Sequence, residues 1–148
     1  MDFSEFTGGA ARYRYGDDDE CRRRPRILLV EDDAETRGLL RQLLARAGYD
    51  VTSVAGFEQA LCTAERESFD LLIADVVLPD GCGWTLFEVL RERWPSLPGI
   101  VISAHILPEH VARSLAAGFW AHVPKPTDFT RLKVEIRRCL LGRVAANN

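Results

Sequence analysis

From residue 26 onward, short runs of apolar residues alternate with amphipathic stretches, and this alternation limits the possible folds more than any other feature of the sequence. The apolar runs predict strands over residues 27–30, 51–54, 70–75, 100–103 and 119–123. Strands that alternate with helices run parallel and form one sheet that is buried on both faces. We therefore expect an α/β fold in which a doubly wound, five-stranded parallel sheet is flanked by five helices.

Between the predicted strands, apolar residues recur at helical spacing and are bounded by residues that start or stop helices. A helix is expected over 34–47, with Asp33 as its N-cap and Gly48 directly after its end. Further helices are expected over 57–64 and 84–94. The apolar positions of the first helix are Leu39, Leu40, Leu43, Leu44 and Ala47.

The last two helices follow from the same signals. Pro108 can begin a helix that ends before Gly118, and a final helix follows Pro126 with Thr127 as its N-cap. The residues expected to face inward on the first of these helices are Val111, Ala112, Leu115 and Ala116. On the final helix they are Phe129, Leu132, Ile136, Cys139 and Leu140.

Composition excludes several classes of protein. The 148 residues suit one domain, and 47% apolar with 28% charged residues is typical of a globular protein. A net charge of −3 gives no overall positive field for DNA, and no apolar run approaches the roughly 18 residues of a membrane span. The N-terminus lacks the pattern of a secretory signal, so we expect a cytoplasmic protein that binds neither DNA nor membranes directly.

The expected domain organisation is simple. Residues 1–25 carry an acidic and a basic run without periodicity and are interpreted as a flexible leader. Residues 26–141 form the domain, and residues 142–148 form a short C-terminal tail that leaves no room for an output domain.

Polar residues follow four of the predicted strands at the points where those strands end. They are Glu31 and Asp32 after the first strand, Asp75 at the end of the third, Ser103 at the end of the fourth, and Lys125 after the fifth. Carboxyl ends of parallel strands meet at one edge of the sheet, so these side chains converge there. Clustered carboxylates without histidine or cysteine favour Mg2+, and a carboxylate beside Mg2+ and an ammonium can attack a phosphoryl group. Asp75, on the central strand, is the expected nucleophile.

These residues resemble the receiver domain of two-component response regulators, which has a flavodoxin-like (βα)5 fold. The resemblance covers about residues 26–141, and its motifs are Leu-Leu-Val-Glu-Asp-Asp at 28–33, the segment 75–81, Ile-Ser-Ala at 102–104, and Lys-Pro at 125–126. It implies that a sensor histidine kinase or a phosphotransfer protein donates a phosphoryl group to the domain. It also implies that the domain catalyses its own phosphorylation, and we expect no separate enzyme activity.

The resemblance also assigns roles to single residues. Asp75 would be the phosphoacceptor, and Ser103 and Lys125 would bind the phosphoryl group. The Mg2+ ligands would be Glu31, Asp32, Asp75 and the backbone carbonyl of Val77. The family's rate-tuning positions are Val77 and His105 here, and because valine cannot orient an attacking water we expect slow dephosphorylation.

One family position departs from the usual pattern. His122 stands at the position of the family's aromatic switch residue. Two interpretations are open: His122 acts with Ser103 as the switch, or it is a plain surface histidine.

The output is open at this point. A stand-alone receiver signals by protein contact, and the family commonly uses the face formed by the fourth helix, the fifth strand and the fifth helix. A phosphate relay, a shuttle to a target protein and a phosphate sink are equally compatible with the sequence, as is a monomer or a weak homodimer. The alternative function is a degenerate receiver that binds proteins independently of phosphorylation.

Overall fold

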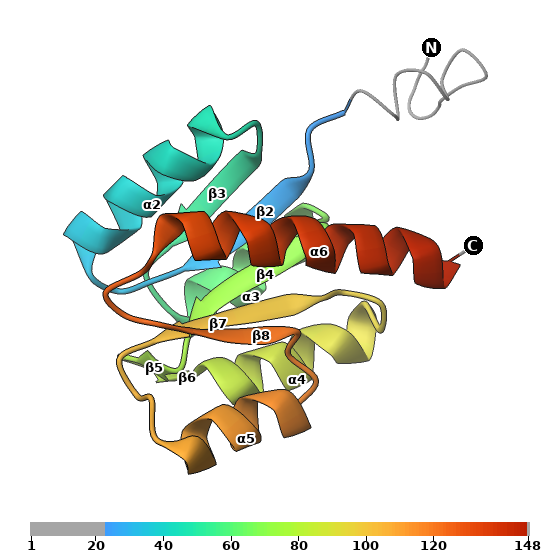
Figure 1. Ribbon diagram of the computed structural model, residues 1–148. Helices are drawn as coiled ribbons and strands as arrows, with labels where there is room; N and C mark the ends of the chain where they lie inside the picture. The colour runs from blue at the N-terminus through green and yellow to red at the C-terminus, as the bar shows by residue number, and fades with distance from the viewer. Residues whose placement is uncertain (1–22, 148) are drawn as a thin grey trace.

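Five apolar strands form the centre of the protein, whose computed structural model describes residues 23–147 (Figure 1). They are β2 (Arg26–Val30), β3 (Asp50–Val54), β4 (Leu71–Asp75), β7 (Gly99–Ser103) and β8 (Ala121–Pro124). All pairings between them are parallel, in the order β3-β2-β4-β7-β8, which confirms the predicted doubly wound sheet. A short antiparallel hairpin of β5 (Val77–Leu78) and β6 (Gly81–Cys82), absent from the expectation, follows β4.

Helices cover both faces of this sheet (Figure 1). They are α2 (Ala34–Arg46), α3 (Phe57–Arg66), α4 (Gly83–Arg93), α5 (Pro108–Ala116) and α6 (Phe129–Asn147). Successive strand residues point to opposite faces, so Leu28 packs on the side of α3 and α4 while Ile27 packs on the side of α2 and α6. Within residues 23–147, no helix has both the length and the apolar character needed to cross a membrane.

Most predicted helix ends are confirmed. The Asp33 carboxylate accepts a hydrogen bond from the Thr36 backbone N–H at 2.9 Å and caps α2. Gly48 and Gly118 follow α2 and α5 with φ of +105° and +100°, a conformation that favours glycine.

The predicted N-cap of the last helix is wrong. Asp128, not Thr127, occupies that position, and its carboxylate accepts the backbone N–H of Arg131 at 3.2 Å. Both residue types cap helices well, and α6 begins at Phe129, which places Asp128 directly before it. The helix then continues to Asn147, past residue 141 where we expected the domain to end. Of the expected leader, residues 1–22 lie outside the described part of the chain.

The inward face predicted for α5 is also wrong. Leu115 is 50% exposed, Ala112 and Ala116 are exposed, and Val111 is only half-buried. The buried residue of this helix is Ser114. A similar error affects Leu39 of α2, which is exposed. Apolar spacing identifies a helix. It does not show that a hydrogen bond to a polar side chain of the neighbouring strand decides which face of the helix is buried.

That partner of α5 is His122 of β8, which is 6% exposed rather than a surface residue. Its Nδ1 lies 2.9 Å from Ser114 Oγ and its Nε2 lies 3.0 Å from the carbonyl oxygen of His105. Burial lowers the pKa of His122, the hydrogen bond to the His105 carbonyl opposes this shift, and the nearby His110 and Arg131 add to it. The expectation of a surface histidine is therefore wrong.

Gly83 of α4 allows the helix to pack directly against the strand that carries Asp75. A Cβ at Gly83 would lie 2.3 Å from the carbonyl oxygen of Asp75, a backbone atom that cannot turn away. We expect Gly83→Ala to lower the free energy of unfolding in urea by about 1–3 kcal/mol. Gly38→Ala is the control, because Gly38 lies in α2 with no atom near its added Cβ, and alanine there should stabilise by about 0.5–1 kcal/mol. Equal stability of the two variants would contradict this packing.

The buried His122 predicts a pH dependence of stability. Because its pKa is lowered on folding, the unfolded chain binds more protons as the pH falls below the ordinary histidine pKa of about 6.5. The free energy of unfolding should therefore fall between about pH 7 and 5.5, with a slope from this residue of at most about 1.4 kcal/mol per pH unit. Urea denaturation at several pH values measures it.

His122→Phe should remove this contribution to the slope, even if the variant is less stable at every pH. His105→Gln is the control, because it removes an exposed histidine and keeps the buried ring of His122. A slope that survives in His122→Phe would contradict the assignment.

Candidate functional site

Three carboxylates meet at the carboxyl edge of the sheet, as expected from the ends of the strands. Glu31 and Asp32 follow β2, and Asp75 is the last residue of β4. Each offers one oxygen, and these oxygens all lie within 4.8 Å of one another. Glu31 and Asp75 are buried, whereas Asp32 is exposed. The cluster therefore combines two buried acids with one that faces solvent.

The ammonium of Lys125 joins the two buried acids. Its Nζ lies 2.6 Å from Oε1 of Glu31 and 2.7 Å from Oδ2 of Asp75. The backbone N–H of Lys125 donates to the carbonyl oxygen of Ser103 at 2.8 Å, which ties the loop after β8 to the end of β7. The predicted meeting of Glu31, Asp75 and Lys125 is thus present in the structure.

Burial and charge pairing act in opposite directions on these groups. Burial raises the pKa of Glu31 above its ordinary value, although the hydrogen bond from Lys125 opposes the shift. For Lys125, burial disfavours the ammonium, but its hydrogen bonds to Asp75 and Glu31 outweigh this effect and raise the pKa. The site therefore holds a stable positive charge beside the nucleophile predicted from the sequence.

The donor set fits a hard divalent cation. Three carboxyl groups face one ammonium, so the acids outnumber the basic group by two. Oε1 of Glu31 is buried and faces the Lys125 ammonium at 2.6 Å. Oxygen ligands with this surplus of acids suit Mg2+.

The remaining predicted residues lie beside Asp75. The backbone N–H of Val77 donates to Oδ1 of Asp75 at 3.3 Å, and the Val77 side chain is 53% exposed. Ser103 is fully buried at the end of β7, next to β4, and its Oγ accepts the backbone N–H of His105 at 2.9 Å. Both therefore border Asp75. His122 lies within β8, and its Nε2 contacts the carbonyl oxygen of His105 in the segment after Ser103.

The contacts of two charged residues, Arg37 and Asp80, were not predicted from the sequence. Arg37 of α2 donates to the carbonyl oxygens of Glu31 and Asp32, at 2.9 and 3.3 Å, and so supports the acidic loop. Asp80 does not join the acidic cluster but accepts the backbone N–H groups of Phe57 and Glu58 at the start of α3. The contact of Asp80 with Phe57 joins segments 23 residues apart and has no local sequence signal.

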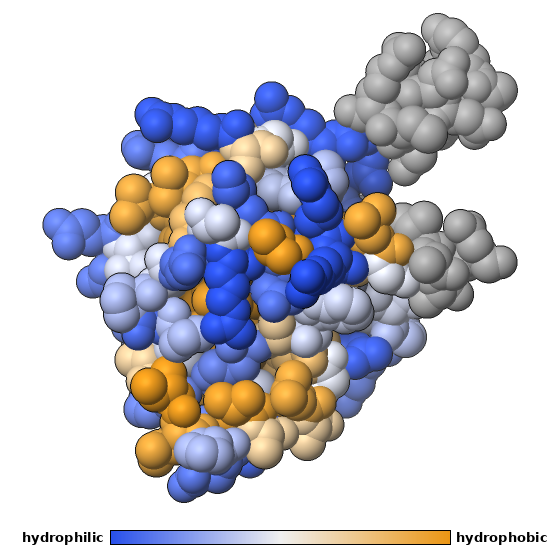
Figure 2. Space-filling view, in the orientation of Figure 1, coloured by the Kyte–Doolittle hydropathy of each residue, from blue (hydrophilic) through white to orange (hydrophobic). Residues whose placement is uncertain are grey.

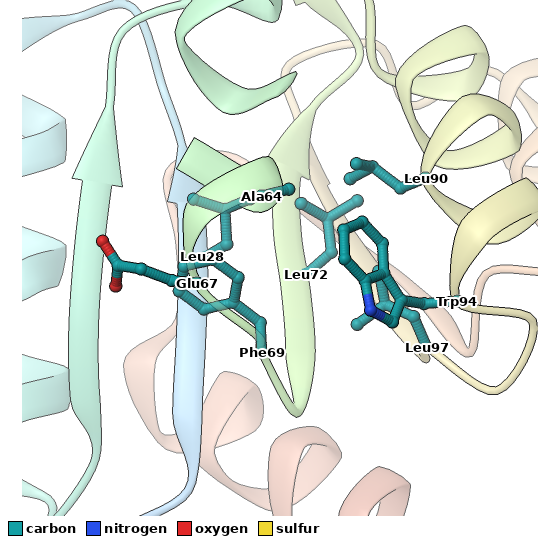
Figure 3. Close-up of a pocket in the computed structure, with 8 residues that line it drawn as sticks. All are labelled: Leu28, Ala64, Glu67, Phe69, Leu72, Leu90, Trp94 and Leu97. Atoms are coloured by element: carbon teal, nitrogen blue, oxygen red, sulfur yellow. The ribbon is translucent and has the colours of Figure 1, made fainter. Parts of the chain in front are cut away.

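An apolar pocket elsewhere in the protein is not this site (Figure 3). It lies between α3 and α4 toward the amino ends of the strands, and its volume of about 10 Å³ is close to the minimum for one water molecule. Glu67 in its wall is engaged by Arg26 at 2.6 Å. The residues around it are Leu28, Ala64, Glu67, Phe69, Leu72, Leu90, Trp94 and Leu97.

Comparison with known proteins agrees with this geometry. The sequence model of the response regulator receiver domain matches residues 27–137. A CheY-like response regulator receiver domain protein from Methanospirillum hungatei superimposes with a TM-score of 0.79 at 30% identity, over 84% of this chain and 99% of the other.

Curated relatives include proteins of different lengths. The response regulator protein PilR of Pseudomonas aeruginosa is 34% identical over 110 residues, which are 74% of this chain and 25% of PilR. An uncharacterised 14.6 kDa protein of Leptolyngbya boryana is 38% identical over 104 residues, which are 69% of this chain and 79% of the relative. The chain spans 25% to 50% of the length of several others, including a transcriptional activator of Burkholderia pseudomallei. The match over residues 27–137, with the acids and the lysine gathered at one edge of the sheet, shows that this chain belongs to the response regulator receiver domain family.

Proposed function

We propose that Asp75 accepts a phosphoryl group from a phosphohistidine of a sensor histidine kinase or a phosphotransfer protein. The observation that carries this proposal is the Lys125 ammonium, 2.7 Å from Oδ2 of the buried Asp75. A carboxylate oxygen of Asp75 attacks phosphorus, the bond from phosphorus to the donor's imidazole nitrogen breaks, and that nitrogen keeps the electron pair and takes up a proton. Receiver domains interact with such kinases and phosphotransfer proteins, which supports this donor class.

Glu31, Asp32, Asp75 and the Val77 carbonyl would hold Mg2+. When bound, Mg2+ neutralises charge on the oxygens of the phosphoryl group during transfer. Lys125 supplies a second positive charge from the side of β8. The surplus of two acids over the basic group supports this ligand set.

Ser103 binds the transferred group and reports its presence. Its contact with the His105 N–H uses a lone pair of Oγ, so the hydroxyl proton can donate to a phosphoryl oxygen. His122 bonds to the carbonyl of the same His105, and we propose the pair Ser103 and His122 as the switch.

The output is a phosphorylation-dependent protein contact on the face of α5, β8 and α6. Figure 2 shows apolar side chains gathered over α5. Leu115 of this helix and Ile106 and Leu107 in the segment before it are each at least half exposed. Exposed apolar patches commonly mark protein contacts. We propose a cytoplasmic regulator that is a monomer or a weak dimer. Phosphorylation-dependent capture of a target protein would indicate a shuttle. Return of the phosphoryl group to a histidine protein would indicate a relay.

Incubation with Mg2+ and acetyl phosphate should add one phosphoryl group, seen as a single adduct by intact-mass spectrometry. Asp75→Asn and a metal chelator should each abolish the adduct, because the first removes the nucleophile and the second the cation. Asp128→Asn is the control, because Asp128 caps α6 away from the acidic cluster and its variant should still be labelled.

A folded protein that takes no adduct from acetyl phosphate or from a phosphohistidine donor would contradict the proposal. That result would instead favour the alternative, a degenerate receiver that binds partners independently of phosphorylation.

Loss of the phosphoryl group should be slow because the exposed Val77 side chain cannot hold a water for attack. Val77→Asn should shorten the half-life of phosphorylated Asp75 by about two- to tenfold, since an amide can orient the water. Val77→Ala distinguishes orientation of the attacking water from simple shielding of the phosphorylated Asp75, because alanine opens space without adding a polar group. A half-life in Val77→Asn that equals or exceeds the wild-type value would refute this role.

A further inference from the structure

A groove between α2 and α6, which cover the same face of the sheet, is lined by positive charge (Figure 1). Its volume is about 500 Å³, and three basic residues of α6 line it: Lys133, Arg137 and Arg138. Tyr49, just after α2, lines it as well. Burial raises the pKa of Tyr49, and the nearby charge of Arg137 opposes this rise. Among the described residues, none that lines this groove is acidic.

The three basic side chains are exposed. Within residues 23–147, no carboxylate forms an ion pair with any of them. Glu135 of the same helix instead accepts the indole N–H of Trp120 at 3.2 Å. Lys133 and Arg137 are four residues apart, a spacing at which like charges destabilise a helix. The groove therefore offers a site where negatively charged groups would relieve repulsion.

An acidic run precedes the point where the chain enters the sheet. Residues 17–20 are Asp-Asp-Asp-Glu and lie just outside the described part of the chain. The backbone N–H of Asp50 donates to the carbonyl oxygen of Pro25 at 2.9 Å, so Pro25 lies beside the residue that follows Tyr49 of the groove. The five to eight residues from the run to Pro25 can span about 16 to 29 Å. The basic residues of the groove extend over only about 8 Å of α6, so this tether is long enough for the run to meet them.

Two arginines at the start of the described chain already have acidic partners. Arg23 pairs with Asp70 at 3.7 Å. Arg26 pairs with Asp50 at 3.7 Å and with Glu67 at 2.6 Å. These arginines therefore compete weakly with the groove for the acidic run.

We propose that the acidic run at residues 17–20 docks in the basic groove between α2 and α6 of the same chain. Its carboxylates pair with Lys133, Arg137 and Arg138 and neutralise the groove. Each exposed ion pair contributes little, but the short tether keeps the run at a high effective concentration beside its site. The docked run shields the groove from acidic partners, and this contact does not depend on phosphorylation of Asp75.

Carbodiimide cross-linking of the full chain tests the docking, because the reagent joins a carboxylate and an ammonium that are in contact through an amide bond. The lysines of the chain are Lys125 and Lys133, and Lys125 is engaged by Glu31 and Asp75. Peptide masses after digestion should therefore show residues 17–20 joined to Lys133 in a protein of monomeric mass. Raising NaCl from about 0.02 to 0.5 M should lower the yield of this link at least about twofold, because salt screens exposed charges.

A pair of double variants isolates the role of the groove. Arg137→Gln with Arg138→Gln keeps Lys133 and the acidic run but weakens their attraction, so the yield at low salt should fall at least about twofold. Arg66→Gln with Arg93→Gln is the matched control. It removes the same charge from exposed arginines of α3 and α4, on the other face of the sheet, and should keep the wild-type yield.

A mixture of unlabelled and isotope-labelled protein identifies which chain supplies the run. Links between the two labels would show that a second copy fills the groove and would overturn docking within one chain. No link to Lys133 in the folded wild type would also overturn the proposal, as would a yield that the Arg137 and Arg138 changes leave unaltered or that both double variants lower equally. Circular dichroism verifies folding, and the salt series on the wild type carries the test if the groove variant does not fold.

Discussion

The site depends on one ammonium placed between two buried carboxylates. Glu31 and Asp75 come from adjacent strands, and without Lys125 their charges would repel each other in a region that water hardly reaches. Removing one partner from a buried ion pair is strongly destabilising, because the other charge remains uncompensated. The ammonium therefore does two things at once: it makes the acidic edge compatible with folding, and it holds positive charge beside Asp75.

That arrangement exists only because the sheet is parallel. Residues 31, 75 and 125 are far apart in sequence, yet each follows or ends a strand, and parallel strands deliver such residues to one edge. The apolar strand residues packed on both faces fix the register, for example of Asp75 opposite Ile102. Close contact of α4 at Gly83 with the Asp75 backbone adds to this rigidity. Apolar packing thus positions the polar residues at the carboxyl edge of the sheet, although those residues take no part in the packing.

The separation between packing residues and polar site residues explains which features of the structure could be predicted from the sequence. The meeting of Glu31, Asp75 and Lys125 was predictable, because it follows from topology once the strands are assigned, and Gly48 or Asp33 signal helix ends locally. The inward face of α5 was not predictable, since it depends on a hydrogen bond between Ser114 and His122 that no periodicity encodes. The buried position of His122 has the same cause.

A helix held by such bonds behaves differently from one held by apolar packing. Hydrophobic contact is non-directional and resists displacement in proportion to the area buried, whereas hydrogen bonds can be exchanged when a neighbouring donor or acceptor moves. α5 buries a serine and leaves Leu115 in solvent, so few apolar contacts oppose its displacement. The same arrangement leaves the apolar side chain of Leu115 exposed on α5. The burial of a serine in place of a leucine is therefore what leaves apolar surface exposed at α5.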